Sequence, residues 1–153
     1  MSFLEEIKSI ESDRNSQENI VVNDIVDYFR KKMENEEWKT ILKDNYIKRA
    51  INEGKNTCDL HIEFWEYSSG CSPTNIEVWS CGRFEIKGEN GNYDSYYNYK
   101  GIRLQEIHKR VCLEISKLLK KKLEELGLKI VGSEREDNKY RFGYYKERIT
   151  IGW

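Results

Sequence analysis

Tryptophan, arginine and carboxylate side chains alternate with apolar ones between residues 59 and 87, and these residue types could form a binding surface. One parity of the alternation contains His61, Glu63, Trp65, Tyr67, Glu77, Trp79, Arg83, Glu85 and Lys87. Successive side chains of a β-strand point to opposite faces, so we expect these residues to share one face of a sheet, opposite to Phe84. Large aromatic side chains among charges are typical of a surface that binds a partner or a ligand. The alternative, that N-terminal helices cover this face and bury Trp65 and Trp79, stays open.

The segment 87–101 is a second candidate for binding because tyrosines alternate there with asparagine, serine, glycine and aspartate. Tyrosine offers a large contact area at a low entropic cost, and the small polar residues adapt their hydrogen bonds to a partner. The alternative is an edge strand whose tyrosines pack flat on the sheet. The predicted binding residues of the two regions are Trp65, Tyr67, Trp79, Arg83, Tyr93, Tyr96, Tyr97 and Tyr99.

Patterns that indicate catalysis are weak. Glu85 and Lys87 match the E-x-K half of a metal-dependent nuclease site, in which carboxylates hold Mg²⁺ and a lysine orients the attacking water. The second carboxylate would come from Asp59, Glu63 or Glu77. An alternating charged strand produces this pattern by chance, and residues 57–101 contain 7 acids against 3 bases, a balance that repels DNA.

Other chemical motifs are missing from the sequence. It contains no glycine-rich phosphate-binding motif, and neither His61 nor His108 accompanies a known nucleophile pattern. The cysteines Cys58, Cys71, Cys81 and Cys112 lack C-x-x-C spacing, so we expect reduced thiols rather than a zinc site. The sequence therefore favours a non-enzymatic function with no cofactor and no metal.

The charge distribution bears on the class of partner. The net charge of the 153-residue chain is −1, so we expect no bulk attraction to nucleic acid. Residues 102–153 carry 13 bases against 8 acids, which fits the solvated back of a helix or a basic docking face. A winged-helix DNA-binding reading, with a recognition helix marked by Lys39, Lys43, Lys48 and Arg49, is a further alternative.

We expect a cytoplasmic protein. No apolar run approaches the ~20 residues that a membrane span requires. The first ten residues include Glu5 and Glu6 and lack the basic start and apolar run of a signal peptide. Neither a membrane partner nor secretion is therefore expected.

The elements that must position these residues follow from the periodicity. Apolar residues recur at three- and four-residue steps over 102–126 and predict one long helix that ends at Gly127. Strands are expected at 59–67, at 75–87 as one long strand, at 93–99, at 128–134, at 139–145 and at 148–153, with a turn at residues 146–147. Short helices at 3–10, about 24–33 and 36–53 precede them, and residues 12–19 are expected to be a linker.

The predicted fold class is α+β: an antiparallel sheet of about six strands, one long helix packed on it, and two to three N-terminal helices. We expect one domain over residues 1–153, with a helical segment at 1–54 and a sheet-plus-helix core at 57–153.

The favoured function is a small cytosolic protein that binds a protein partner and blocks it. Richness in Lys, Asn, Ile, Glu and Tyr indicates an AT-rich genome, and the chain is similar in style, though not in any motif, to accessory proteins of bacteria and phages. A binder of a small ligand or nucleotide is the first alternative, with Trp79 stacking on a ring and Arg83 and Arg141 meeting a phosphate. The oligomeric state is not predictable from these patterns.

Overall fold

The long amphipathic stretch forms helix α4 (Leu104–Glu125), which packs on an antiparallel sheet and confirms the predicted α+β class. This computed structural model describes residues 2–65, 74–86, 98–136 and 144–153. One side of α4 is buried, at Leu104, Ile107, Val111, Cys112, Ile115, Ser116, Leu119 and Leu123. Lysines on its other side keep that surface in water. Gly54 and Gly127 follow the two predicted helix ends with φ of +77° and +84°, a conformation that glycine adopts without strain.

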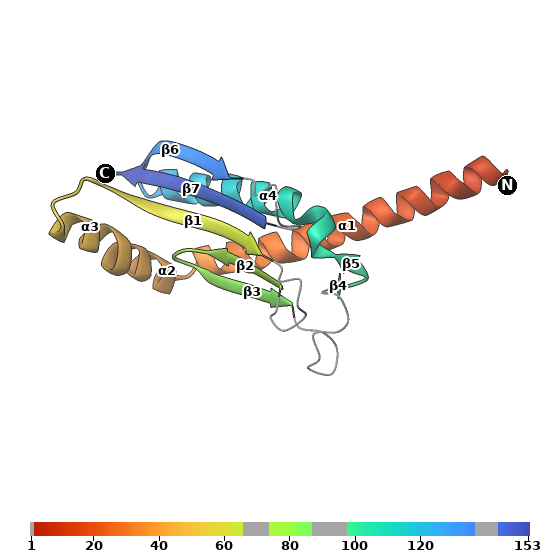
Figure 1. The fold of residues 1–153 in the computed structure, drawn as a ribbon. Helices are drawn as coiled ribbons and strands as arrows, with labels where there is room; N and C mark the ends of the chain where they lie inside the picture. Colours follow the sequence, from red (N-terminus) through yellow and green to blue (C-terminus); the bar gives the residue numbers. More distant parts are fainter. Residues whose placement is uncertain (1, 66–73, 87–97, 137–143) are drawn as a thin grey trace.

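The main sheet has five strands rather than about six, in the order β3-β2-β1-β7-β6, and all neighbours are antiparallel (Figure 1). The strands are β1 (Thr57–Trp65), β2 (Thr74–Val78), β3 (Gly82–Ile86), β6 (Lys129–Glu136) and β7 (Tyr144–Gly152). Two short strands, β4 (Asn98–Tyr99) and β5 (Ile102–Arg103), form a separate hairpin that leads into α4.

The N-terminal region contains one helix, α1 (Phe3–Met33), where the sequence predicted two helices and a linker. The linker prediction for residues 12–19 was wrong because the segment is polar but contains neither glycine nor proline to interrupt a helix. An ion pair one turn apart, from Arg14 Nε to Glu18 Oε1 at 3.4 Å, lies within it. Ser2 caps the start in a capping box with Glu5.

A second helical run covers residues 36–52, close to the predicted 36–53. It consists of α2 (Glu36–Ile41), the π-helix η1 (Leu42–Ile47) and α3 (Lys48–Asn52). The Asn35 side chain accepts a hydrogen bond from the backbone of Glu37 and starts the run.

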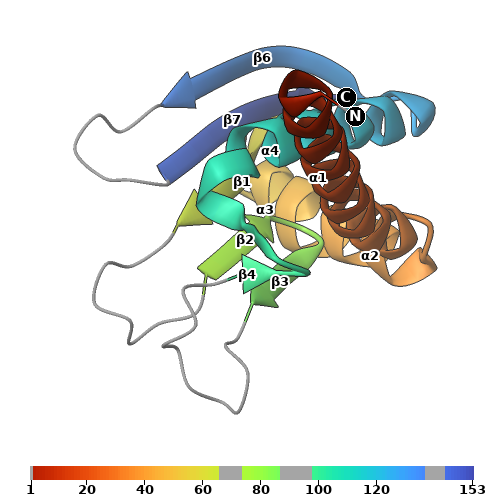
Figure 2. The ribbon, with the colours of Figure 1, turned by 90° about the vertical axis from the view of Figure 1, so that its right-hand side faces the viewer.

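Helices α1 and α4 lie on the same side of the sheet, and no helix of the described ranges covers the other side (Figure 2). One cluster of buried side chains joins the second half of α1, the inner side of α4 and one face of strands β1, β2 and β7. The strand residues in it include Leu60, Ile62, Phe64, Ile76, Val78, Tyr145, Ile149 and Ile151. Within the described ranges, the opposite face of the sheet therefore has no helix packed on it.

The predicted long strand over 75–87 is instead the β2–β3 hairpin, with its turn at residues 79–81. The register pairs Ile76 with Phe84 and Glu77 with Arg83, so the reversal keeps the two alternating sets on separate faces. The sequence therefore predicted the correct face for the apolar side chains of this segment, although it did not predict the turn.

Two other strand predictions differ from the structure. The turn predicted at residues 146–147 lies inside β7, where Glu147 is buried at 1% exposure. Ser116, Ser133 and Tyr145 donate hydrogen bonds to this carboxylate, so it is tolerated within the core. Of the predicted strand at 93–99, only Asn98 and Tyr99 fall within the described residues, and there they form β4.

Candidate functional site

The candidate site is the sheet face that faces away from α1 and α4, called here the open face. It is formed by His61, Glu63 and Trp65 of β1, Glu77 of β2, Arg83 of β3, Trp79 of the β2–β3 turn, and Lys146 and Arg148 of β7. Their strand neighbours on the other face are the buried core residues, because side chains alternate along each strand. The strand pairing therefore places the whole set on one side.

A row of four charges crosses the open face from β3 to β7. Glu63 lies directly opposite Glu77, and each has a base on its outer side. Arg83 Nε lies 2.9 Å from Glu77 Oε2, and Lys146 Nζ lies 3.8 Å from Glu63 Oε1. Burial raises the pKa of Glu63, and the nearby Glu77 adds to this rise while Lys146 opposes it. The row is therefore a mixed-charge surface rather than a uniformly acidic or basic one.

Trp65 and Arg83 form an aromatic–cation contact on this face. The guanidinium carbon of Arg83 lies 5.9 Å from the centre of the Trp65 ring. Because Arg83 also pairs with Glu77, its position is held from two sides. Arg83 is exposed and Trp65 is half-buried, so a partner has access to both.

Trp79 packs against His61 with ring centres 4.3 Å apart in an edge-to-face arrangement. Burial lowers the pKa of His61, and the positive charges of Lys146 and Arg148 lower it further. The imidazole is therefore neutral at physiological pH. Its Nδ1 atom is buried and has no hydrogen-bond partner within the described residues. Phe84 instead contacts Tyr28 on the opposite face, as the alternation predicts.

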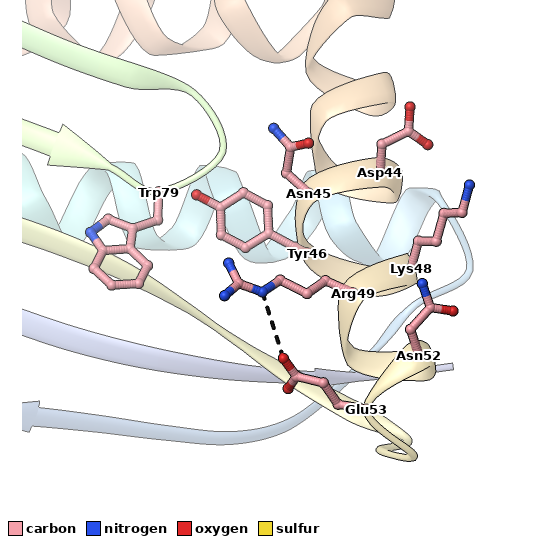
Figure 3. Close-up of a pocket in the computed structure, with 8 residues that line it drawn as sticks. All are labelled: Asp44, Asn45, Tyr46, Lys48, Arg49, Asn52, Glu53 and Trp79. Atoms are coloured by element: carbon pink, nitrogen blue, oxygen red, sulfur yellow. Dashed lines mark ion pairs between the residues drawn. The ribbon is translucent and has the colours of Figure 1, made fainter.

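An open groove of about 910 Å³ adjoins the open face, between η1, α3 and Trp79 (Figure 3). Tyr46 and Arg49 extend from the helical run toward Trp79, whereas Asp44 and Lys48 point away from it. Arg49 Nε lies 3.6 Å from Glu53 Oε1, an exposed ion pair at the foot of the groove. The π-helix sets the direction of Tyr46, and π-helical turns are frequent at functional sites.

A buried hydrogen bond fixes the turn that carries Trp79. Trp38 Nε1 of α2 donates to Ser80 Oγ at 3.0 Å. Ser80 has a φ of +97°, a conformation that costs a residue with a side chain roughly 1–3 kcal/mol. The bond to Trp38 offsets part of that cost, so α2 and η1 determine where Trp79 lies.

The chain matches no known protein family model, no curated protein and no solved structure.

The residues predicted as a binding site fall into two groups. Trp65, Trp79 and Arg83 lie together on the open face. Tyr99 is half-buried in β4 and packs edge-on against Phe84, on the helix side of the sheet. Tyr67, Tyr93, Tyr96 and Tyr97 lie outside the described residues, as does Arg141.

The side of the groove formed by Tyr46 and Arg49 was not predicted from the sequence. Arg49 was considered only as part of a DNA-recognition helix, and Tyr46 was not singled out. A local sequence pattern does not indicate a π-helix, so the direction of Tyr46 had no signal in the sequence. For the winged-helix reading, β1 would be a wing, yet it is the nine-residue central strand of the sheet.

The described residues give little support to metal or thiol chemistry. No group of three or more His, Cys, Asp and Glu side chains within them could hold a metal ion. Glu85 pairs across the sheet with Asn75 rather than with Glu63 or Glu77, and Lys87 lies outside the described residues. Cys58 and Cys81 are free, and burial raises the pKa of the first to about 11 and of the second to about 12. Both thiols are therefore protonated at neutral pH and poor nucleophiles.

His108 is half-buried and stacks on Phe64 with ring centres 4.6 Å apart. Its ring therefore contributes to packing of α4 on the sheet. None of the helices in the described ranges has the length and apolarity that crossing a membrane would take.

Proposed function

We propose that this chain is a cytosolic, non-enzymatic binding protein that holds a protein partner on the open face and blocks it, in the manner of bacterial or phage accessory proteins. The supporting observation is the Trp65–Arg83 contact beside Trp79, on a sheet face that no described helix covers. Tryptophan and arginine are the residue types most enriched among the residues that dominate protein–protein binding energy.

The charge arrangement also supports a protein rather than a nucleic acid as the partner. Arg83 and Lys146 are each paired with a carboxylate, so the row across the open face offers no continuous positive stripe to a phosphate backbone. Alternating charges around aromatic side chains give a protein interface its orientation and its specificity. A protein with a complementary mixed-charge surface fits this face.

The test compares the partners of wild type, two open-face variants and one control variant. Affinity purification from the native host, followed by mass spectrometry, identifies proteins that wild type retains and that Trp65→Ala and Arg83→Glu variants lose. Lys43→Glu, an exposed change on η1 outside the open face, is the matched control. Titration calorimetry with the recombinant partner then measures the loss of affinity.

We expect each open-face variant to weaken binding by about 2 kcal/mol or more, or roughly thirtyfold in Kd, while circular dichroism shows that the fold is retained. A partner bound equally well by wild type, Trp65→Ala and Arg83→Glu would contradict the proposal.

The groove supports a second candidate, a binder of a small aromatic anion such as a nucleotide. Trp79 and Tyr46 offer ring surfaces, and Arg49 extends beside Tyr46 toward Trp79 with its side chain 78% exposed (Figure 3). Arg49 takes the phosphate-binding role that the sequence had suggested for Arg83, since Arg83 lies on the open face and pairs with Glu77.

A thermal-shift screen with purified nucleotides separates the two candidates. A ligand present at about 100 times its Kd stabilises the native state by about 2.7 kcal/mol, which raises the Tm of a chain of this size by roughly 5–10 °C. The shift should disappear in Arg49→Ala and persist in Lys43→Glu. If no nucleotide shifts the wild-type Tm, this candidate is rejected and the protein-binding proposal is unaffected.

A further inference from the structure

A pocket of about 680 Å³ lies on the helix side of the sheet, between the second half of α1, strand β3 and the β4–β5 hairpin. It shares no lining residue with the groove beside Trp79. Its β3 residue, Phe84, is on the face of the sheet opposite to the open face. The pocket is therefore a separate candidate site.

Three aromatic side chains form a continuous surface in this pocket. The Phe84 ring packs edge-to-face against Tyr28, with ring centres 5.2 Å apart, and against Tyr99, with ring centres 5.6 Å apart. Each of the three lines the pocket and is half-buried, so part of each ring is accessible. Phe84 therefore lies in the middle of an aromatic floor on which a further ring can pack.

An ammonium group lies near each of the two outer rings. Lys32 Nζ is 5.5 Å from the centre of the Tyr28 ring, and Lys100 Nζ is 5.6 Å from the centre of the Tyr99 ring. A ligand on the central ring would therefore meet positive charge at both ends of the floor.

The two carboxylates that line the pocket already have basic partners. Asp24 Oδ2 accepts a hydrogen bond from Lys100 Nζ, and this bond raises the pKa of Lys100. Asp27 pairs with Arg30. Neither carboxylate therefore requires a cation from a ligand.

The lining residues at the C-terminal end of α1 are in the opposite situation. Lys31 and Lys32 are exposed and have no carboxylate partner within the described residues. Asn35 follows them, and because its Oδ1 accepts a hydrogen bond from the backbone N–H of Glu37 at 3.3 Å, its Nδ2 group remains a donor. This end of the pocket therefore offers two positive charges and an amide donor to an anion.

The β4–β5 turn is tied to α1 at this pocket. Lys100 has a φ of +49°, which is uncommon for a residue with a side chain and is typical of strained positions at functional sites. Gln17 Nε2 donates a hydrogen bond of 2.7 Å to the Lys100 carbonyl oxygen, and Asp24 holds the Lys100 side chain. These contacts keep Tyr99 and Lys100 beside Phe84.

We propose that this pocket binds an aryl phosphate, with its ring on Phe84 and its phosphate at Lys31, Lys32 and Asn35. A phosphate monoester carries a charge of about −2 and three strong acceptor oxygens at neutral pH, which matches two ammonium groups and an amide donor. The lysines around the floor disfavour a cationic ligand. Because the pocket and the open face are on opposite sides of the sheet, this binding is independent of the proposed partner.

The test is an NMR titration of the full chain with phenyl phosphate, followed through the backbone amide signals. Signals of residues 31–35, Phe84 and Tyr99 should shift saturably. Phenol and inorganic phosphate, the two halves of the probe, should each bind roughly tenfold more weakly or less. A phosphotyrosine peptide titrated in parallel distinguishes a protein side chain from a free aryl phosphate, by whether it binds more tightly than phenyl phosphate. No saturable shift with millimolar phenyl phosphate overturns the proposal, as does a shift confined to other residues.

Two variants test the assignment of the residues. Lys31→Gln/Lys32→Gln should weaken phenyl phosphate binding by roughly tenfold or more, and Phe84→Leu, which keeps an apolar side chain but removes the ring, should also weaken it. Lys8→Gln/Lys43→Gln, at two exposed lysines outside the pocket, is the matched control and should bind like wild type. Wild-type affinity in Lys31→Gln/Lys32→Gln would mean that these lysines only complement the C-terminal end of the α1 dipole, and it overturns the proposal.

Discussion

The hydroxyl of Tyr145 donates a hydrogen bond of 2.7 Å to Oε1 of Glu147, two residues further along the same strand. Both side chains are 1% exposed and lie on the face that packs against α4. The other carboxylate oxygen accepts hydrogen bonds from Ser116 and Ser133, each at 2.8 Å, and lies 3.2 Å from Lys120 Nζ. A buried carboxylate is tolerated here because donors surround both of its oxygens.

Tyr145→Phe should destabilise the protein by about 1.5–3 kcal/mol, since it removes a hydrogen bond to a charged group but keeps the ring that fills the core. Urea unfolding should show a lower midpoint with an unchanged m value. Tyr144→Phe, at the neighbouring half-buried position on the other face, is the control and should change stability by less than about 0.5 kcal/mol. Equal effects of the two changes would mean that the Tyr145–Glu147 bond adds nothing.

The same carboxylate predicts an acid limit to stability. Burial alone would raise the pKa of Glu147, but hydrogen bonds from Tyr145, Ser116, Ser133 and Lys120 together hold it below its usual value of 4.5. The unfolded chain then binds this proton more readily than the folded one. The stabilisation is therefore complete above about pH 4.5 and is lost as the pH falls through the lower folded value.

As the pH falls from about 4.5 through the lower folded value, the unfolding free energy should therefore decrease more steeply for wild type than for Glu147→Gln, which has no proton to gain at this position. If the unfolding free energies of the two proteins decrease equally as the pH falls, Glu147 does not have this role.

Leu119 is fully buried at the centre of the α4–sheet contact, so Leu119→Asp should unfold the protein. An unpaired carboxylate at this position is expected to cost more than ~4 kcal/mol, a large part of the stability of an average domain. Circular dichroism and a thermal melt provide the measurement. Lys109→Asp, on the exposed side of the same helix, should melt like wild type. A cooperative melt of Leu119→Asp near the wild-type Tm would contradict the packing of α4.

Trp38→Phe should disturb Trp79 without touching it. The change leaves the buried Ser80 hydroxyl without the 3.0 Å bond from the Trp38 indole and should cost about 1–3 kcal/mol. In an NMR spectrum the indole N–H signal of Trp79 should shift, because the turn that carries it is no longer fixed. Trp153→Phe, at the exposed end of the chain, is the control. If the Trp79 signal moves in neither variant, α2 does not position it.

The tyrosines Tyr96 and Tyr97 lie outside the described residues, but the sequence still predicts a role for them in partner binding. Tyr96→Ala with Tyr97→Ala should leave the Tm unchanged and abolish capture of the partner that wild type retains. Capture at wild-type affinity would remove this segment from the binding surface.

The alternation over β1 to β3 determined by itself which side chains share a face, because a pleat of period two leaves only two faces on which to place them. Trp79 and Phe84 lie on the opposite faces predicted for them, although the turn at residues 79–81 was not predicted. The α4 helix was likewise determined by its own 3.6-residue period, which is a local property of the chain.

Tertiary structure decided what local patterns do not specify. The polar stretch at residues 12–19 is helical because it continues a helix whose second half is packed in the core, and extending a formed helix is easier than starting one. Glu147 lies inside a strand because donors distant in the sequence, Ser116 and Ser133, meet it there. The groove beside Trp79 exists only where η1 packs against the β2–β3 turn, a contact between segments more than thirty residues apart that no local period encodes.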